Sequence, residues 1–426
     1  MSDLPPQVVQ VVEPHSLSLS SGQMRFTIHF TFLSWALALA SLASACVTRD
    51  VNAQKAFAHP GLLHTAKDFE RINGFLKANR APWTTGWDKL AVRAVASYTP
   101  RPVETLCRGS GSDCTENYSL LFRDAAAAYA NAVHWKISGN ETHAEAAGRI
   151  LDAWSSTLLR IWGSSDKFLA SGIYGYQLAN AGELLRDWSG WKGLDALSSM
   201  LTNVFYPMNH DFFVRHNGAA IDHYWANWDL ANMCTMQAIG ILSDNVTMYN
   251  EAVDYFKNGA GNGQIENAIW KIHEEAGSKK RLGQGQEAGR DQGHALLDFA
   301  FLGVFAQQSY NQGDDLFGYL DNRILAGAEY VAKYNLGYDV PFANFTNSHG
   351  TATVISEAGR GGLRPIWELI YAHYDSIKGL NASWSGQMRD LVNEDAGGAE
   401  GGGGDYGPNS GGYDQLGFGT LLYRRE

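Results

Sequence analysis

The chain has few cysteines and no run of basic residues. Only 4 of its 426 residues are cysteine, and none combines with histidine at the spacing of a zinc site. Its net charge is −11, whereas binding to nucleic acid requires a basic surface. We therefore predict no metal site, no cofactor and no nucleic-acid partner. An anionic ligand has to be bound by local arginine, histidine and amide groups.

Strand-like alternation of apolar and polar residues is also scarce. Apolar residues instead recur at every third and fourth position, which is typical of amphipathic helices, and the short connections place successive helices antiparallel. No repeat of 34 or 40 residues is visible, so a solenoid is disfavoured. We predict an all-α fold in which helical hairpins close into an (α/α) toroid, an incomplete barrel. The expected helices span 65–78, 84–97, 117–138, 141–161, 174–188, 193–214, 222–242, 247–257, 263–274, 288–310, 322–335 and 363–377.

Composition divides the chain into three parts. Residues 1–53 contain Met24 and Arg25, then an apolar stretch that ends in small residues near Ala45, as in a secretory signal. Polar residues interrupt this stretch, which disfavours a membrane anchor. Residues 54–390 read as one helical domain. Residues 391–426 form a Gly-rich tail, in which 397–412 is expected to be a flexible loop and the residues from Tyr413 onward can dock on the body.

Two further features indicate a secreted, extracellular glycoprotein without membrane contact after signal cleavage. Cys107 and Cys114 bracket a short loop that can close as a disulfide in an oxidising compartment. Cys234 lies in an apolar helix and is expected to be a buried free thiol, and Cys46 can leave with the signal. Five sequons for N-glycosylation are present, at Asn117, Asn140, Asn245, Asn344 and Asn381.

The most informative segment is residues 284–294. Read as a helix start, it places Arg290 and His294 on one face, together with Gln286, Glu287 and Asp291 on neighbouring turns. The apolar run that follows must be buried, so these polar groups lie at the mouth of a buried helix. A positioned histidine beside an arginine suits proton transfer on an anionic substrate.

Three other segments offer site residues. On a helix, His223 and Asn227 share a face, with Tyr224 and Trp225 beside them, and Asn227 can either donate to a carboxylate or brace a neighbouring helix. Tyr174, Tyr176 and Gln177 lie at a helix entry, where they can line a cleft or pack in the core. His349 lies in a loop after Pro341, where it can contact substrate, transfer a proton or lie on the surface.

These motifs resemble the alginate-lyase-like polysaccharide lyases, which include the alginate and glucuronan lyases. The resemblance covers roughly residues 55–385, and its most specific part is Gln284 to His294. It implies an (α/α) toroid with an open groove across one end. It also implies a secreted enzyme that cleaves an anionic polysaccharide, a polyuronate, by β-elimination without a metal.

The chemistry explains the residue types. The C5 proton of a uronate becomes removable when its carboxylate is neutralised, a role that fits Asn227 with Arg290. His294 is then the first choice as base or acid, and the family implies a tyrosine, Tyr224 or Tyr174, for the other role. The sequence departs from the best-known members, which carry Asn and His adjacent and a Tyr seven residues after the Arg. Here Trp228 and Leu297 stand at those positions, and His349 can replace the tyrosine.

Two alternatives remain open. A glycoside hydrolase on an (α/α) barrel needs two carboxylates beside the scissile bond, which Glu287, Asp291 or Asp229 can supply. A non-catalytic glycan-binding protein would use the aromatic residues without needing Arg290 or His294.

Overall fold

The structure is a computed structural model, and it describes residues 55–111 and 113–426. The expected signal segment and Cys46 lie outside these residues. Within them, no helix is both long and apolar enough to cross a bilayer. The helices are α1 (Ala66–Lys77), α2 (Trp83–Arg93), α3 (Ser119–Ser138), α4 (Glu141–Thr157), α5 (Lys167–Leu185), α6 (Leu194–Met200), α7 (Tyr206–Arg215), α8 (Ala226–Leu242), α9 (Val246–Asn258), α10 (Ile265–Ala268), α11 (Gln292–Asn311), α12 (Tyr319–Asn335), α13 (Trp367–Tyr371), α14 (Ser383–Asp395) and α15 (Gly419–Leu422).

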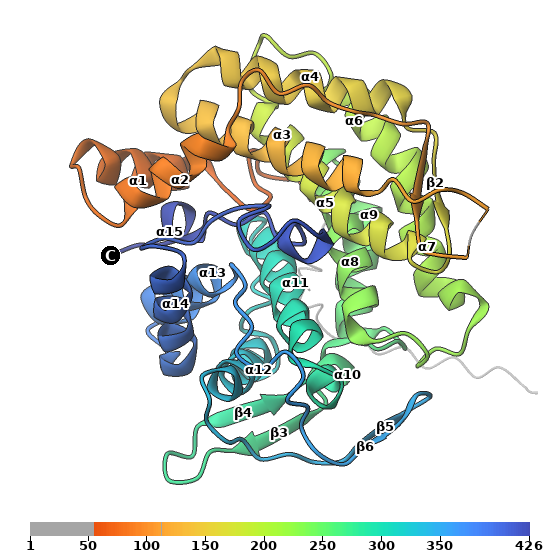
Figure 1. The fold of residues 1–426 in the computed structure, drawn as a ribbon, viewed down its shortest axis with the longest axis vertical. Coiled ribbons are helices and arrows are strands. Elements are labelled where there is room, and N and C mark those ends of the chain that lie inside the picture. The colour runs from red at the N-terminus through yellow and green to blue at the C-terminus, as the bar shows by residue number, and fades with distance from the viewer. Residues whose placement is uncertain (1–54, 112) are drawn as a thin grey trace, which may run out of the picture. The chain divides into compact units, whose positions relative to one another are not determined.

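Six short strands form three separate pairs. The pair β1 (Thr105–Arg108) and β2 (Arg160–Gly163) is parallel. The pairs β3 (Lys271–Glu274) with β4 (Arg281–Gln284), and β5 (Phe345–Asn347) with β6 (Gly350–Ala352), are antiparallel hairpins. The two hairpins lie together at the bottom of Figure 1.

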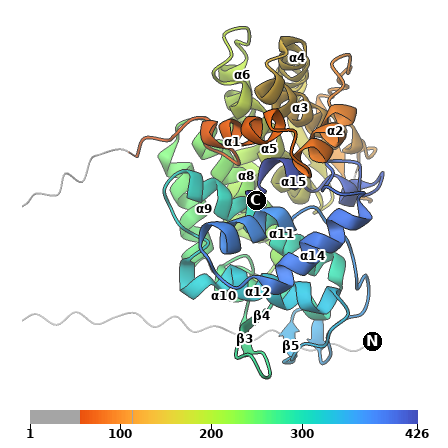
Figure 2. The same cartoon turned by 90° about the vertical axis from the view of Figure 1, so that its left-hand side faces the viewer.

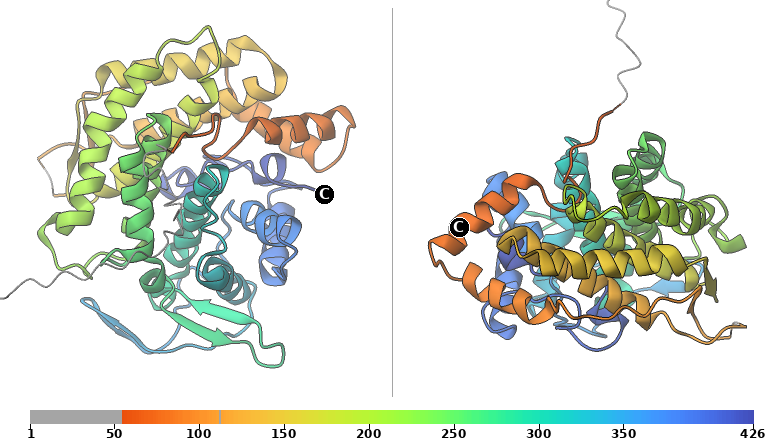
Figure 3. Two further views of the ribbon diagram at one scale, coloured as in Figure 1. Left: turned by 180° about the vertical axis from the view of Figure 1, so that it is seen from behind. Right: turned by 90° about the horizontal axis from the view of Figure 1, so that it is seen from above.

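Four long helices form the centre of the fold. Figures 1 and 3 show α3, α5, α8 and α11 grouped inside, with α4, α6, α9 and α14 outside. The inner helices are buried on nearly every face, whereas α4 and α9 alternate between buried and exposed residues. Glycines allow the backbones of α5 and α8 to approach closely, since a Cβ at Gly172 would lie 2.7 Å from the backbone of Ala231. The architecture is the (α/α) toroid that the sequence predicts.

The inner helices begin on the same side of the domain. The side chain of Asn232 on α8 donates to the carbonyl of Phe168 at the start of α5. The first N–H group of α8, that of Ala226, donates to the side chain of Gln286 just before α11. Because the N-terminal end of a helix carries partial positive charge, this side favours anions.

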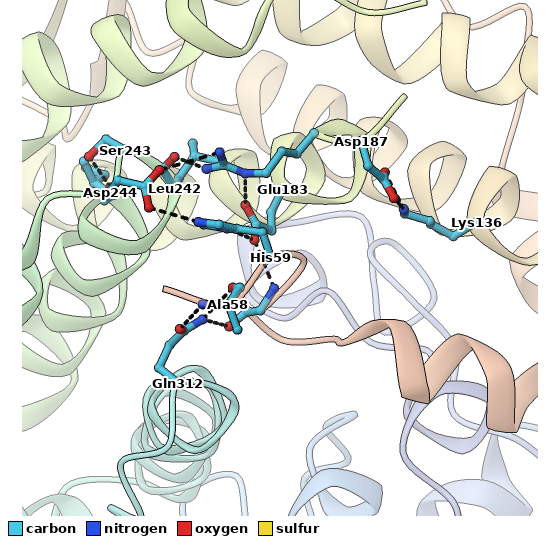
Figure 4. A network of polar contacts seen from close by, with 12 residues as sticks. Ala58, His59, Lys136, Glu183, Asp187, Leu242, Ser243, Asp244 and Gln312 are labelled. Atoms are coloured by element: carbon cyan, nitrogen blue, oxygen red, sulfur yellow. Dashed lines mark hydrogen bonds and ion pairs between the residues drawn. The ribbon is translucent and has the colours of Figure 1, made fainter. Parts of the chain in front are cut away.

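The residues before α1 are bound to the C-terminal ends of the inner helices α5, α8 and α11. His59 Nδ1 lies 2.6 Å from Glu183 Oε1, and Gly61 N–H donates to the same oxygen at 3.0 Å (Figure 4). His59 Nε2 lies 3.1 Å from Asp244 Oδ1. The side chain of Gln312 accepts the backbone N–H of Ala58 and donates to its carbonyl. Burial alone would lower the pKa of His59, but its hydrogen bonds and the charge of Glu183 outweigh burial and raise it.

The Gly-rich segment is packed, which corrects the expectation of a flexible loop over 397–412. Glu400 is fully buried, and its Oε1 accepts the N–H groups of Trp367 and Glu368 at the start of α13. Figure 2 shows α15 next to α1 and α2. There Arg71 Nη2 donates to the carbonyl of Leu422 at 2.6 Å. The segment closes the domain because its glycines adopt turns that other residues would strain, such as the one at Gly417 with φ 75°.

Several helix expectations need correction. Residues 263–274 form only the short helix α10, and Lys271–Glu274 is a strand, because Gly277 at φ 85° turns the chain back as a hairpin. The stretch 193–214 is divided by a π-helical turn at Leu201–Phe205. Residues 160–161 belong to β2, and α8 begins only at Ala226. The sequence analysis also missed α14 and the other short strands.

Candidate active site

The segment that contains Arg290 and His294 is not one continuous helix. A 3-10 turn spans Gln286–Gly289, and α11 begins at Gln292. Asp291 is the N-cap of α11 in an extended conformation, and its Oδ1 accepts the N–H of His294 at 2.9 Å. The expected start at residue 288 is therefore wrong. Arg290 and His294 nevertheless come together across the cap.

His294 is held from both ring nitrogens. Its Nδ1 lies 2.7 Å from Asp291 Oδ2, and its Nε2 lies 3.1 Å from Arg290 Nη2. A guanidinium can only donate, so Nε2 accepts and the Nδ1 proton goes to Asp291. Burial alone would raise the pKa of Asp291, but its hydrogen bonds with His294 and the charge of Arg290 lower it. With 40% of its side chain exposed, His294 is an accessible imidazole whose Nε2 faces Arg290.

Arg290 is also bound to Glu287. Its Nη1 donates to Glu287 Oε2 at 2.6 Å, and Glu287 Oε1 accepts the backbone N–H of Asn227 at 3.0 Å and the side-chain amide at 2.6 Å. Asn227 is 1% exposed and Glu287 is fully buried. This corrects the expectation that Asn227 faces a substrate carboxylate, since its amide donates to Glu287. Of this group, Arg290 alone reaches the surface, with 26% of its side chain exposed.

A second carboxyl group lies behind this pair. Asp298 on α11 is 2% exposed. Burial, followed by repulsion from Glu287, raises its pKa well above the ordinary range for an aspartate. Glu287 is the carboxylate that binds Arg290 directly.

A cavity of about 230 Å³ opens on the outer side of Arg290. The Arg290 guanidinium lies 5.1 Å from the Trp225 ring, and Trp225 stacks on His349 with ring centroids 5.2 Å apart. His349 is on the turn of the β5–β6 hairpin, and its Nε2 donates to the carbonyl of His223 at 2.8 Å. The loop histidine and the residues at the start of α8 therefore come together, as expected for a substrate pocket.

Gln286 lies deeper in this region. It is 2% exposed, and its Oε1 accepts the N–H of Ala226 at the start of α8. Together with Glu287 it anchors the start of α8 to the turn before α11, and Gln286 also helps to line the cavity. The expectation of a substrate contact is corrected for Glu287, which is fully buried and does not line the cavity.

The tyrosines named from the sequence are buried. Tyr174 is fully buried, and its hydroxyl accepts from Arg108 Nη1 at 3.1 Å. The Tyr224 hydroxyl accepts from the Asn217 side chain at 2.9 Å, and the residue is 8% exposed. Neither phenol is free to reach a substrate.

Tyr176 and Gln177 do not line a cleft either. Both are fully buried. The Tyr176 hydroxyl donates to the carbonyl of Asp414 at 2.6 Å, and Gln177 Nε2 donates to that of Tyr413 at 2.8 Å. Their role is to anchor the C-terminal segment, which explains why amide and phenol groups occur inside an otherwise apolar helix.

Sequence reasoning missed a second charged cluster beside His294. Asp414 is 5% exposed and lies 3.3 Å from Arg364 Nη1. Its pKa is raised by burial, while the charges of Arg364 and Arg108 act in the opposite direction. The Arg108 guanidinium also lies 4.9 Å from the ring of the half-buried Tyr118. No local signal could reveal this cluster, because its members come from four distant segments.

The carboxylates required for a glycoside hydrolase are already engaged. Glu287 binds Arg290 and Asn227, and Asp291 binds His294. Asp229 is 1% exposed, with Oδ2 accepting the N–H of Gly263. Among residues 55–111 and 113–426, no group of three His, Cys, Asp or Glu side chains is placed to hold a metal ion.

The remaining residues named from the sequence are the cysteines and the sequon asparagines. Cys107 and Cys114 form a disulfide, and Cys234 is a buried free thiol. Of the sequons, Asn117 is internally bonded, since its Nδ2 donates to the carbonyl of Thr105 at 3.0 Å. Asn140 and Asn245 cap α4 and α9 through their side-chain oxygens, which leaves their amide nitrogens outside the cap bond.

Comparison with known proteins gives a consistent result. The model of the family described as alginate lyase matches residues 108–339. An alginate lyase from Bacteroides ovatus has a TM-score of 0.58 at 12% identity, over 87% of this chain and 100% of that chain. Alginate lyase A1-III from Sphingomonas species A1 has a TM-score of 0.54 at 13% identity, over 87% and 100%. No curated protein sequence matches the chain.

A variant of alginate lyase A1-III in complex with a tetrasaccharide is also similar, with a TM-score of 0.54 at 11% identity over 86% of this chain and 98% of that chain. At such identities the structural likeness shows the fold alone. Together, the (α/α) toroid and the matched family define a polysaccharide lyase. The chain belongs to the alginate lyase family, whose model matches more than half of its length.

Proposed function

We propose that this lyase cleaves a polyuronate, alginate or glucuronan, by β-elimination without a metal ion. The observation that carries the proposal is the pairing of Arg290 Nη2 with His294 Nε2 at 3.1 Å beside an open cavity. A uronate carboxylate in this cavity offers Arg290 a charged acceptor, which is stronger than a neutral imidazole. When the guanidinium turns to the carboxylate, the lone pair of His294 Nε2 becomes free.

His294 then takes the C5 proton. Asp291 stabilises the imidazolium that forms, and Arg290 stabilises the charge that develops on the substrate carboxyl group. The C4–O4 bond breaks as the C4–C5 double bond forms, and O4 needs a proton. We assign this proton to Tyr118, because Tyr174 and Tyr224 are buried and hydrogen-bonded whereas Tyr118 is half-buried beside Arg108.

The test is incubation with polymannuronate, polyguluronate and glucuronan while the near-ultraviolet absorbance of the unsaturated product is recorded. We expect turnover of at least one polymer. His294→Ala should abolish it, with a loss of about 10²–10⁴-fold or more, and should leave the fold intact. Tyr118→Phe should slow it. Sugar release without new absorbance would instead indicate a hydrolase, and binding without turnover would indicate a glycan-binding protein.

The proposal also excludes a catalytic cation, because Arg290 neutralises the substrate carboxylate. Treatment with a chelator should leave the rate unchanged. Lasting inactivation that is reversed by added calcium would contradict the role of Arg290 and indicate a cation bound by carboxylates.

We further propose that the enzyme acts outside the cell. The Cys107–Cys114 disulfide suits an oxidising compartment, and the sequence carries a signal-like segment and sequons. Mass spectrometry of protein from the culture medium tests this through the mature N-terminus and the attached glycans.

A further inference from the structure

Trp162 is an exposed tryptophan with two cations near its ring. It lies on β2, and 39% of its surface is exposed. The Arg160 guanidinium lies 5.5 Å from its ring centroid and the Lys167 ammonium 5.7 Å. An exposed aromatic ring with cations beside it can bind a ligand both by stacking and by charge.

The two cations are not used in ion pairs. Arg160 Nε donates to the hydroxyl of Thr105 at 2.9 Å. Within residues 55–111 and 113–426, neither Arg160 nor Lys167 has a carboxylate within 4.0 Å. Of the acidic groups nearby, Asp113 accepts from the indole N–H of Trp162, and the charge of Asp166 contributes to the raised pKa of Arg108. Both positive charges are therefore available to an anion.

The indole is held in place before any ligand arrives. Its N–H donates to Asp113, which lies in the loop closed by the Cys107–Cys114 disulfide. Trp162 is also directly opposite Cys107 in the parallel β1–β2 pair. The next residue, Gly163, has φ 130°, and a Cβ there would lie 1.9 Å from the carbonyl of Arg108, so only glycine allows this close pairing. Such preorganisation lowers the entropic cost of binding.

The strand that carries Trp162 pairs with the strand that carries Arg108, a member of the charged cluster beside His294. Arg108 itself binds the buried Tyr174. Trp162 is exposed on the partner strand, where it helps to line an open cavity of about 490 Å³ together with Lys167, Phe168 and Tyr206.

We propose that Trp162, Arg160 and Lys167 bind a uronate unit of the polysaccharide at a distance from the bond that is cleaved. The apolar face of a pyranose ring stacks on the indole, and the carboxylate of the same or the next unit binds the two cations. This inference rests on the proposed polyuronate substrate. It assigns a distal subsite that acts on affinity for long chains and leaves the chemical step alone.

The test is the kinetics of Trp162→Ala on long polymer and on the shortest oligosaccharide that is turned over. On polymer we expect KM to rise about threefold to tenfold, the size of one exposed stacking contact, while kcat is unchanged. On the short substrate neither constant should change. Trp162→Phe should restore part of the affinity, and the double change Arg160→Ala with Lys167→Ala should raise KM on polymer and weaken its salt dependence.

Matched controls remove similar groups elsewhere. Tyr338 is an exposed aromatic residue and Lys192 an exposed lysine, and neither lines the site. Tyr338→Ala and Lys192→Ala should leave both constants unchanged. Binding of polymer to the His294→Ala protein, measured by affinity electrophoresis, gives a readout without catalysis and should weaken when Trp162→Ala is added.

Each outcome decides the inference. An unchanged KM on polymer for a folded Trp162→Ala protein overturns the subsite, while turnover by the wild type keeps the lyase function. An equal loss of kcat on both substrates also overturns it, because Trp162 would then support the active site structurally. A wild-type protein that neither binds nor cleaves any of the three polyuronates overturns the proposed function and the subsite together.

Discussion

The change Asp291→Asn separates the two roles of one carboxylate. Asp291 Oδ1 caps α11 by accepting the N–H of His294, and Oδ2 accepts from His294 Nδ1. Asparagine keeps the first oxygen but places an NH₂ group where the second stood. The Nδ1 atom must then accept, and the proton moves to Nε2, where it faces an N–H of Arg290. His294 then has no lone pair on Nε2, the atom that takes the C5 proton in the proposed mechanism.

The structural cost of this change is small. Asparagine caps helices about as well as aspartate. The variant loses the favourable interaction of the carboxylate with the helix end, about 0.3–1 kcal/mol. It also loses a partly exposed ion pair with Arg290 Nε at 3.6 Å, about 0–1 kcal/mol. We therefore expect the free energy of unfolding to fall by about 0.3–2 kcal/mol.

The catalytic cost should be much larger. An imidazole forced into the wrong tautomer loses about 10⁴-fold in a serine protease, and a proton-transfer group typically contributes 10²–10⁴-fold. We expect kcat to fall in this range, which corresponds to about 3–5 kcal/mol of activation free energy. Absorbance of the unsaturated product gives the rate, and urea unfolding gives the stability.

Asp315→Asn is the matched control. Asp315 accepts the N–H of Gly318 at 3.0 Å and pairs with Lys378 at 2.6 Å, away from the site. It should lose similar stability and no activity. If folded Asp291→Asn protein keeps activity within about threefold of the wild type, the tautomer of His294 does not matter, and His294 is not the base.

Three further changes test other parts of the structure. Arg290→Lys should reduce kcat/KM on polymer by about 10²-fold with little change in Tm, because an ammonium cannot bind Glu287 and a uronate in the same planar arrangement; equal activity would make Arg290 purely structural. The pKa of His59 is raised in the folded protein, so its contribution to the free energy of unfolding is present below its ordinary pKa of 6.5 and is lost as pH rises through the raised value. The loss of Tm in His59→Gln should therefore be larger near pH 5.5 than near pH 8.5, and a loss that does not depend on pH would contradict this. Burial and the charge of Glu368 raise the pKa of Glu400 from 4.5 to about 8. The wild-type protein therefore loses stability as pH rises between these two values. Glu400→Gln should raise Tm near pH 9 but not near pH 4, and an unchanged Tm near pH 9 would contradict the raised pKa.

Much of the fold could be predicted because its signals are local. The periodicity of apolar residues located α1, α3, α4 and α9 to within a few residues. The antiparallel order follows from short connections. The segment after Gly261 was misread because the same apolar spacing fits a short helix followed by a hairpin, and the difference depends on pairing between Lys271–Glu274 and Arg281–Gln284.

The site was predictable only in part for the same reason. The contact between Arg290 and His294 is local and was found from spacing. The partners of Asn227 and Tyr176 are 60 and 238 residues away, so no pattern near them shows whether their polar groups face a substrate or the protein. The Arg108, Arg364 and Asp414 cluster depends on such distant contacts throughout.

The C-terminal segment has a consequence for when the enzyme becomes active. Tyr176 and Gln177 lie early in the chain, but the carbonyl groups they bind, those of Tyr413 and Asp414, are made 236 to 238 residues later. Arg71 binds Leu422, which is 351 residues away. During synthesis, the inner helices therefore leave the ribosome well before the segment that completes the cluster beside His294. A nascent chain carries His294 long before the segment from Tyr413 to Leu422 has been made, and we expect no lyase activity before that segment is in place.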